Sequence, residues 1–198
     1  MKILAFVDLH GSTSILKKIA DLAKKENVDY IVCAGDITIF GDSMREMVDQ
    51  LDAVGVPSIM LHGNHEDEGV LRKVCDSTKN VRFLHKEIYE TDGYVFMGYG
   101  GGGFSSTDPA FEKWSKQAMS EISEGKKIIL VTHAPPYGTK IDQVLDQPAG
   151  CKSVRQFIKL VQPKLVISGH LHENAGIKDR IDKTKIVNPG PWGMILTV

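Results

Sequence analysis

The 198-residue chain predicts an α/β fold with two sheets in a single domain, residues 1–198, and three observations indicate this. In the first half, short apolar runs rich in β-branched residues alternate with segments of helical periodicity, which is typical of a largely parallel sheet with crossover helices. After Val81, shorter runs separated by turns such as Asp92-Gly93 predict hairpins and a second, more antiparallel sheet. No Pro/Gly/Ser-rich linker and no repeat interrupts the chain, so one domain is expected.

Three strand-helix units are expected in the first half. The run Ile3–Val7 is apolar throughout, as in a strand covered on both faces, and it stops at Asp8. Ser12 or Thr13 then provides a cap for a helix whose apolar residues recur at helical spacing. The same pattern repeats twice, so we expect strands at 3–7, 30–34 and 58–61 and helices around 15–23, 44–51 and 70–74.

The second half is expected to contain more strands than helices. Glycines 100–103 form a tight connection rather than a phosphate-binding P-loop, because no Gly-Lys-Ser/Thr ending follows them. The tail alternates turn residues with short strands, which predicts an antiparallel finish. We expect strands at 81–84, 87–90, 94–98, 127–132, 165–168, 175–178, 185–187 and 194–198, and helices at 109–123 and 153–161.

Composition and charge exclude several classes of protein. Lys and Arg number 24 against 25 Asp and Glu, so the net charge is −1 and bulk binding of nucleic acid is not expected. No apolar run approaches the roughly 20 residues that span a bilayer. Asp8 and His10 interrupt the first apolar run before a signal sequence can form, and the three cysteines show no CxxC spacing. A cytoplasmic protein with no membrane span is expected.

Five predicted strands end in short polar motifs. Ligand sites of open α/β sheets form beyond the carboxyl ends of the strands, so these motifs are expected to converge. Asp8 and His10 are two residues apart, as are His170 and His172, and an extended backbone would place each pair on one face. The motifs together offer seven oxygen or nitrogen donors and no thiolate: Asp8, His10, Asp36, Asn64, His133, His170 and His172.

Seven donors are too many for one ion. A single ion takes four to six ligands including water, so the set fits two divalent ions that share a bridging carboxylate, for which Asp36 is the natural choice. Imidazoles and carboxylates suit Mn, Fe, Co, Ni or Zn better than Mg or Ca, and Mn is favoured. His65, next to Asn64, is left over by this count and suits a general acid.

The ordered motifs resemble those of the calcineurin-like metallophosphoesterases, in particular the small prokaryotic-type members. The segments that carry the resemblance are Asp8-Leu9-His10-Gly11, Gly35-Asp36, Gly63-Asn64-His65-Glu66, Thr132-His133-Ala134-Pro135 and Gly169-His170-Leu171-His172. The resemblance implies a four-layer α-β-β-α sandwich of two mixed sheets. It also implies a first metal bound by Asp8, His10, Asp36 and His172, and a second bound by Asp36, Asn64, His133 and His170.

By this resemblance, a hydroxide that bridges the two metals attacks phosphorus while His65 protonates the leaving group. We expect a metal-dependent phosphoesterase, and a phosphodiesterase in particular, because the motifs contain no Arg or Lys to clamp the extra charge of a monoester. The expected partner is a small phosphorylated substrate, with nucleotide-like compounds among the candidates. A phosphomonoesterase, a nucleotide pyrophosphohydrolase and a non-catalytic protein-interaction scaffold stay open as alternatives, as does a homodimer.

Several other residues near the motifs are assigned ordinary roles. The aromatic rings of Phe40, Phe104, Tyr137 and Trp192 are of the kind that stacks on nucleobases, but packing against their own scaffold is expected. Glu66 is expected to cap the helix that follows it. His62 and His85 are interpreted as core or surface histidines outside the site.

Overall fold

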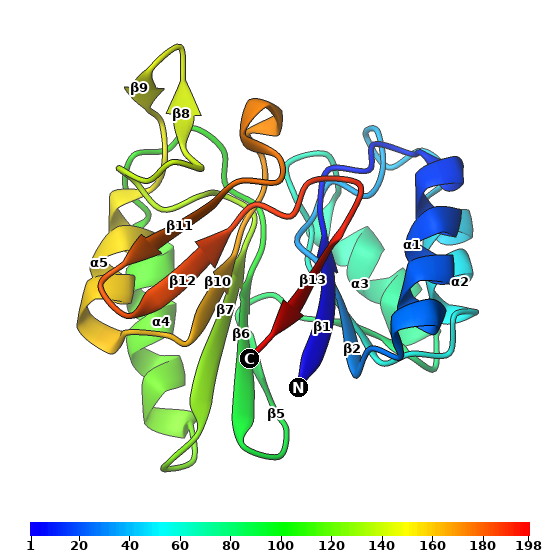
Figure 1. Ribbon diagram of the computed structural model, residues 1–198, viewed down its shortest axis with the longest axis horizontal. Coiled ribbons are helices and arrows are strands. Elements are labelled where there is room, and N and C mark those ends of the chain that lie inside the picture. Colours follow the sequence, from blue (N-terminus) through cyan, green and yellow to red (C-terminus); the bar gives the residue numbers. More distant parts are fainter.

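The first of two sheets has the strand order β13-β1-β2-β3-β4 in the computed structural model, which describes residues 1–198 (Figure 1). Strands β1 to β4 run parallel, and β13 pairs antiparallel with β1. The members are β1 (Lys2–Phe6), β2 (Tyr30–Cys33), β3 (Ser58–Met60), β4 (Val81–Phe83) and β13 (Met194–Thr197).

The second sheet has the order β11-β12-β10-β7-β6-β5. Its four central strands run parallel, while β11 and β5 are antiparallel edges, so both sheets are mixed. A two-stranded hairpin projects from the loop after β7 (Figure 1). The elements are β5 (Glu87–Glu90), β6 (Tyr94–Tyr99), β7 (Lys127–Thr132), β10 (Leu165–Ile167), β11 (Lys178–Ile181) and β12 (Thr184–Val187), with β8 (Gln143–Val144) and β9 (Gln147–Pro148) in the hairpin.

Five α-helices cover the outer faces of the two sheets. Figure 1 shows α1 (Thr13–Glu26), α2 (Met44–Asp52) and α3 (Glu68–Asp76) against the first sheet, and α4 (Pro109–Glu121) and α5 (Lys152–Val161) against the second. The layers therefore follow the order α-β-β-α, which confirms the predicted fold class. None of the helices has the length and apolar character needed to cross a membrane.

Strand β1 shows why the two sheets stack. Leu4 and Phe6 belong to the core between the first sheet and helices α1 to α3, whereas Ile3, Ala5 and Val7 belong to the core between the sheets. All five side chains are fully buried. Because successive side chains of a strand point to opposite faces, a strand covered on both faces must be apolar at every position.

The helix starts follow local capping chemistry. The Ser12 side chain accepts a hydrogen bond from the Ile15 N–H and begins α1, as predicted. The Asp67 carboxylate does the same for the Val70 N–H at the start of α3. The expectation that Glu66 caps this helix is therefore wrong, since the neighbouring Asp67 holds that position.

Three further expectations are corrected by the pairing of the strands. Strand β4 lies parallel to β3 in the first sheet instead of opening the second one, because α3 completes a third crossover unit. Residues 175–177 do not form a strand: Gly176 has a left-handed φ of 80°, and β11 begins only at Lys178. In the tail, β12 pairs parallel with β10, while β11 and β13 have the antiparallel partners expected. The hairpin β8–β9 was not predicted.

Candidate metal centre

The polar motifs at the strand ends turn sharply out of the sheets. Asp8, His10, Asp36 and His170 have left-handed φ angles of 58°, 46°, 51° and 71°. Such a conformation costs about 1–3 kcal/mol at a residue other than glycine, and Asp, Asn and His tolerate it best. The extended backbone expected for the two pairs of residues is therefore wrong, and it is the tight turns that aim these side chains at one point.

The motifs after β2 and β3 are tied together by the buried carboxylate of Glu66. It accepts hydrogen bonds from the backbone N–H groups of Asp36 at 3.0 Å, Thr38 at 2.9 Å and Gly63 at 2.9 Å. The Thr38 hydroxyl donates a further bond of 2.8 Å to the same side chain. Sequence reasoning missed this role, for which the only signal was the place of Glu66 inside the third motif. Its function is to fix where Asp36 lies.

Two glycines permit this close approach. A Cβ atom at Gly63 would overlap the carboxylate of Asp36, and one at Gly35 would lie 2.7 Å from both the His133 Nδ1 and the Gly63 nitrogen. Gly35 also has a φ of 103°, which a residue with a side chain rarely adopts. The two loops can meet only because neither position carries a side chain.

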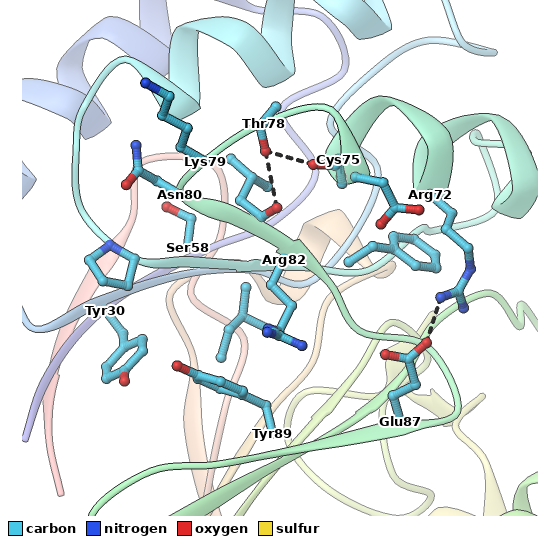
Figure 2. A pocket seen from close by; sticks show the side chains of 15 residues that line it. Tyr30, Ser58, Arg72, Cys75, Thr78, Lys79, Asn80, Arg82, Glu87 and Tyr89 are labelled. Atoms are coloured by element: carbon cyan, nitrogen blue, oxygen red, sulfur yellow. Dashed lines mark hydrogen bonds and ion pairs between the residues drawn. The ribbon is translucent and has the colours of Figure 1, made fainter.

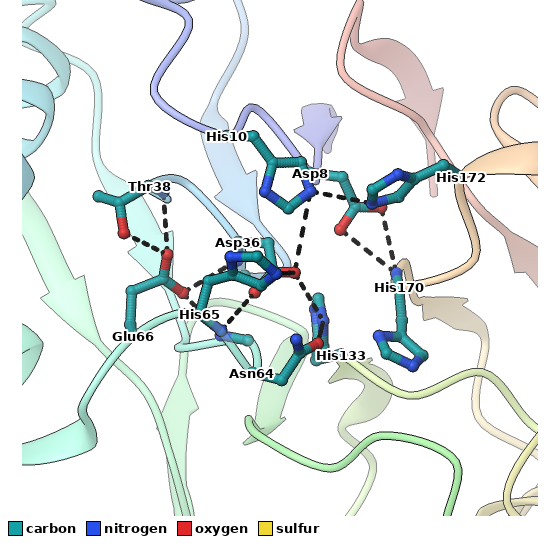
Figure 3. Close-up of polar contacts among 12 residues, drawn as sticks. Asp8, His10, Asp36, Thr38, Asn64, His65, Glu66, His133, His170 and His172 are labelled. Atoms are coloured by element: carbon teal, nitrogen blue, oxygen red, sulfur yellow. Dashed lines mark hydrogen bonds and ion pairs between the residues drawn. The ribbon is translucent and has the colours of Figure 1, made fainter. Parts of the chain in front are cut away.

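Asp36 occupies the centre of the cluster (Figure 3). Its Oδ2 lies 3.4 Å from the Nε2 of His133, 3.9 Å from that of His10 and 4.0 Å from that of His65. Its Oδ1 accepts a 3.0 Å hydrogen bond from the His65 backbone N–H. Burial raises the pKa of this carboxyl, but the hydrogen bond and charge of His133 outweigh burial and lower it to about 2. The carboxylate is thus ionised and faces three imidazoles.

Asp8, His10 and His172 form one side of the cluster, with ligand atoms within 4.8 Å of one another. The Nε2 atoms of His10 and His172 are 2.9 Å apart. The Asp8 carboxylate accepts a 3.1 Å bond from the His170 backbone N–H, which joins the first motif to the last. Burial raises the pKa of Asp8 to about 6, against the attraction of His133 and His172.

His133 forms the other side and carries the most informative contact. It is fully buried, and its Nδ1 lies 2.9 Å from the carbonyl oxygen of Ala34. A carbonyl only accepts, so Nδ1 carries a proton, and Nε2 is the ring nitrogen left to hold either a second proton or a metal ion. The Nε2 faces the carboxylate of Asp36 at 3.4 Å and the Oδ1 of Asn64 at 3.1 Å. Two acceptor oxygens converge on this nitrogen, so the point favours positive charge, either as a proton on Nε2 or as a metal ion in its place.

The protonation of the histidines shows where positive charge is favoured. Burial works against a charged His133, but the hydrogen bond and charge of Asp36 raise its pKa, so in the metal-free protein a proton on Nε2 occupies the position that a metal ion would take. Burial lowers the pKa of His170 to about 4, so this ring is neutral near pH 7. The Nε2 of His170 is buried without any hydrogen-bond partner. The ring centroid of His170 lies 5.2 Å from that of His133, so this nitrogen belongs to the same cluster. An unpartnered imidazole nitrogen is a free ligand atom.

The structure brings all eight sequence-predicted site residues to one place, at the end of the sheets where β1, β2, β3, β7 and β10 finish (Figure 3). Nitrogen and oxygen are the only donor atoms in the cluster, and the Nε2 of His133 faces the carboxylate of Asp36. This set fits divalent cations of the borderline type. The predicted residues are Asp8, His10, Asp36, Asn64, His65, His133, His170 and His172.

A second buried histidine cluster has the opposite hydrogen-bond pattern at His85, although the Nδ1 of its His62 is also buried without a partner. His62, Glu68 and His85 also place three ligand atoms within 4.8 Å of one another. Here the backbone N–H of Gly100 donates a 2.9 Å bond to the Nδ1 of His85, so the proton of the neutral ring sits on Nε2, 3.6 Å from Glu68. A ring nitrogen that carries a proton cannot bind a metal, so this cluster lacks a free ligand at His85.

A cavity with a volume of about 430 Å³ lies elsewhere (Figure 2). Its lining includes Tyr30 and Ser58, the first residues of β2 and β3, so it opens at the opposite end of these strands from the motifs. Within it, the Arg82 guanidinium stacks on the Tyr89 ring at 4.6 Å, and Arg72 pairs with Glu87. Cationic side chains that already have partners do not mark a reactive site.

Comparison with known proteins defines the class to which this fold and cluster belong. The family model described as calcineurin-like phosphoesterase matches residues 1–174. The chain therefore belongs to the calcineurin-like phosphoesterase family, as its motifs predicted. Membership supports a metal-dependent hydrolase of phosphoesters, and together with the cluster of His and Asp side chains it suggests a dinuclear site for divalent metals.

Individual proteins are similar to this chain at various levels of sequence identity. An uncharacterized protein of Methanocaldococcus jannaschii is 30% identical over 96% of this chain and 88% of its own length. A probable cyclic nucleotide phosphodiesterase of Synechococcus is 24% identical over 76% of this chain and 60% of its own length. Among solved structures, TT1561 of Thermus thermophilus has a TM-score of 0.80 at 19% identity, covering 96% of this chain and 88% of that one, which shows the shared fold.

Proposed function

We propose that this protein is a dinuclear metal-dependent phosphodiesterase. In this proposal the first ion is held by Asp8, His10, Asp36 and His172, and the second by Asp36, Asn64, His133 and His170. The observation that carries the proposal is the convergence of the His133 Nε2, the Asp36 carboxylate and the Asn64 oxygen at one buried point. A buried cation at that point removes the repulsion among them.

The protein groups around the ions have defined tasks. Bound ions supply a hydroxide near neutral pH and neutralise the charge that grows on the phosphoryl oxygens. The Ala34 carbonyl fixes the His133 ring with its Nε2 facing inward, and Glu66 holds the backbone of Asp36. The donor set suits Mn, Fe, Co, Ni or Zn, and Mn is our first choice among them.

His65 is proposed as the general acid that protonates the departing alkoxide. Its Nε2 lies 4.0 Å from the Asp36 Oδ2, and its backbone N–H is bonded to the Oδ1 of the same carboxylate. The ring is held between Phe40 on one side, at 4.5 Å, and the edge of His10, at 4.7 Å. The side chain is 22% exposed, so it reaches the solvent-facing side of the cluster, where a substrate enters.

A diester is favoured over a monoester on grounds of charge. Every ion pair at the cluster joins Asp36 to a histidine, and no lysine or arginine pairs with Asp8 or Asp36. The second negative charge of a monoester normally requires such a cationic clamp. The name of the Synechococcus relative, a probable cyclic nucleotide phosphodiesterase, supports the same preference. The proposed substrate is a small phosphorylated compound, and the proposed location is the cytoplasm, in accord with three buried, unpaired cysteines.

The direct test is hydrolysis by chelator-treated protein with Mn, Fe, Co, Ni, Zn or Mg restored singly. The substrates are bis(p-nitrophenyl) phosphate and p-nitrophenyl phosphate. Turnover of the diester that returns with a transition metal and exceeds that of the monoester supports the proposal. Preference for the monoester would favour a phosphomonoesterase, and silence on both with every metal would favour a binding scaffold.

The role of His65 is tested with leaving groups of different basicity. We expect His65→Ala to slow hydrolysis of a dialkyl diester by about 10²- to 10⁴-fold, because an alkoxide needs a proton as it leaves. Release of p-nitrophenolate needs none, so hydrolysis of its esters is expected to fall much less. Equal losses on both types of ester would contradict a general-acid role.

A further inference from the structure

Two exposed phenylalanine rings border the histidine cluster. Phe40, in the loop after β2, is 79% exposed, and its ring is stacked on that of His65 with 22° between the planes. Phe104, in the loop after β6, is 68% exposed, and its ring centroid is 4.8 Å from that of His170. The expectation that these rings pack against their own scaffold is wrong for most of their surface, which faces solvent beside the cluster.

Phe40 combines two unfavourable features. Its φ of 48° lies in the left-handed region, where a bulky residue is strained, and its apolar ring stands in water. The loop holds it there: the Gly41 N–H donates a 3.1 Å bond to the Thr38 hydroxyl oxygen, and that hydroxyl donates to Glu66. A strained residue kept in place beside a reactive cluster indicates a functional demand.

The loop that carries Phe104 is anchored at its base. The Gly101 N–H donates a 2.8 Å bond to the His62 carbonyl, and the Gly100 N–H donates a 2.9 Å bond to His85. A Cβ atom at Gly100 would lie 2.6 Å from the His62 carbonyl oxygen, so this approach requires glycine. The loop therefore starts from a fixed point next to the third motif and places Phe104 against His170.

The chemistry offered around the phosphoester is thus aromatic and not cationic. No lysine or arginine forms an ion pair with Asp8 or Asp36, whereas an exposed ring stands next to His65 and another next to His170. Exposed phenylalanine faces stack on planar rings, including every nucleobase, and contribute little to the binding of small alkyl groups.

We propose that Phe40 and Phe104 form an aromatic subsite that binds a planar ring carried on the ester arm that stays on phosphorus. The inference rests on the proposed phosphodiesterase function and specifies its substrate class, a diester whose retained arm is an aryl or nucleoside group. Both rings act in binding and selectivity, and the attack on phosphorus belongs to the metal cluster.

The test compares three diesters that share the p-nitrophenolate leaving group and differ in the other arm: thymidine 5′-(p-nitrophenyl phosphate), phenyl p-nitrophenyl phosphate and methyl p-nitrophenyl phosphate. The variants Phe40→Ala and Phe104→Ala are assayed as full chains with Mn. We expect each variant to lower kcat/KM for the thymidine and phenyl esters, mainly by raising KM. This reduction should be about tenfold larger than the reduction for the methyl ester. Phe40→Tyr, which keeps a stacking face, should retain the wild-type selectivity.

A matched control is Leu160→Ala on α5, which removes an apolar side chain that is 76% exposed and lies on the outer helical layer. It should leave all three rates unchanged. Loss confined to the thymidine ester would identify a nucleobase as the bound ring, and equal loss on the thymidine and phenyl esters would identify any planar ring.

Two results would overturn the inference while leaving the proposed function intact. If the phenylalanine variants lower kcat/KM equally for all three esters, the rings either brace His65 and His170 or contact the shared p-nitrophenyl leaving group, and they do not bind the retained arm. If they change none of the rates, the rings do not touch the substrate. Absence of turnover by the wild-type protein on every ester would instead overturn the proposed function, and the subsite with it.

Discussion

His133 and His85 are both buried histidines that follow a strand and stand near a carboxylate, yet the backbone contacts their Nδ1 atoms in opposite ways. The Ala34 carbonyl accepts from the Nδ1 of His133, which leaves the Nε2 that faces Asp36 as the nitrogen able to bind a metal. The Gly100 N–H donates to the Nδ1 of His85, which leaves a proton on the Nε2 that faces Glu68. One backbone contact thus decides whether each ring has a free ligand atom.

The comparison teaches that proximity of imidazole and carboxylate groups is a weak sign of a metal site. Both clusters bring three ligand atoms within 4.8 Å. They differ in what the second ring nitrogen contacts, which is the feature that orients a metal-binding histidine. Around Asp36, the Nε2 of His133 faces two acceptor oxygens and is available to a metal ion. Around Glu68, the Nε2 of His85 carries a proton that faces the carboxylate.

The largest expected difference concerns the carboxylate of each cluster. Asp36→Asn removes the charge that faces three imidazoles, so we expect phosphodiesterase activity to fall by at least about 10³-fold and bound metal to be lost. Glu68→Gln is the matched change in the other cluster, at a side chain that is 44% exposed, and should keep both. Elemental analysis and diester hydrolysis measure the two effects. Equal losses of activity and bound metal in both variants would mean that the two clusters do not differ in metal binding.

Metal binding should stabilise the fold through one cluster alone. At a free Mn concentration 100 times the Kd of each ion, the free energy of unfolding is expected to rise by about 2.7 kcal/mol for each ion, because the ions bind only the folded state. His133→Asn removes a ligand of the second ion and should lower this increase, whereas His85→Asn should preserve it, as measured by denaturant unfolding with and without chelator. If the increase in unfolding free energy disappears in His85→Asn, the ion binds at the cluster around Glu68 and the account is contradicted.

Glu66→Gln tests the support behind Asp36. The amide places a donor among three backbone N–H groups that now bond to a carboxylate, so the loop after β2 loses part of its anchor. Changes to groups that orient metal ligands cost about 10- to 100-fold in metal affinity or activity, and a loss in that range is expected here. Isothermal titration with Mn measures it. Unchanged affinity would mean that Asp36 is positioned without Glu66.

The smallest expected effect is the pH dependence of the stability contributed by His85. Burial lowers the pKa of His85 to about 3, below its model-peptide value of 6.5, so the unfolded chain binds its proton first. The stability that this ring contributes is complete above pH 6.5 and declines as the pH falls toward 3. Between pH 6.5 and 5 we expect wild-type protein in chelator to lose about 1–2 kcal/mol more than His85→Asn, whose side-chain oxygen still accepts from Gly100. Parallel pH profiles would contradict a neutral buried His85.

Much of this site could be predicted from the sequence because its residues lie in short motifs directly after apolar runs. Each apolar run stops at a polar motif, and parallel strands bring such ends to one rim, so the eight residues of the cluster were found before their geometry was known. The α/β class and the N-cap Ser12 follow from equally local patterns.

The remainder depends on contacts between distant parts of the chain. The tautomer of His133 is set by Ala34, 99 residues away, and the role of Glu66 by N–H groups up to 30 residues away. Left-handed turns at Asp8 and His170 replace the extended backbone that two-residue spacing suggested. The short run at Val81 is compatible with either sheet, and the preceding crossover decides its place.

The central claim is that two ions bind around Asp36, and crystallography with Mn tests it most directly. Anomalous difference maps of protein crystallised with Mn are predicted to show two peaks about 3.5–4 Å apart on either side of the Asp36 carboxylate, and none beside His85. Absence of any peak at Asp36 under saturating Mn, or a peak at His85 in its place, would contradict the account.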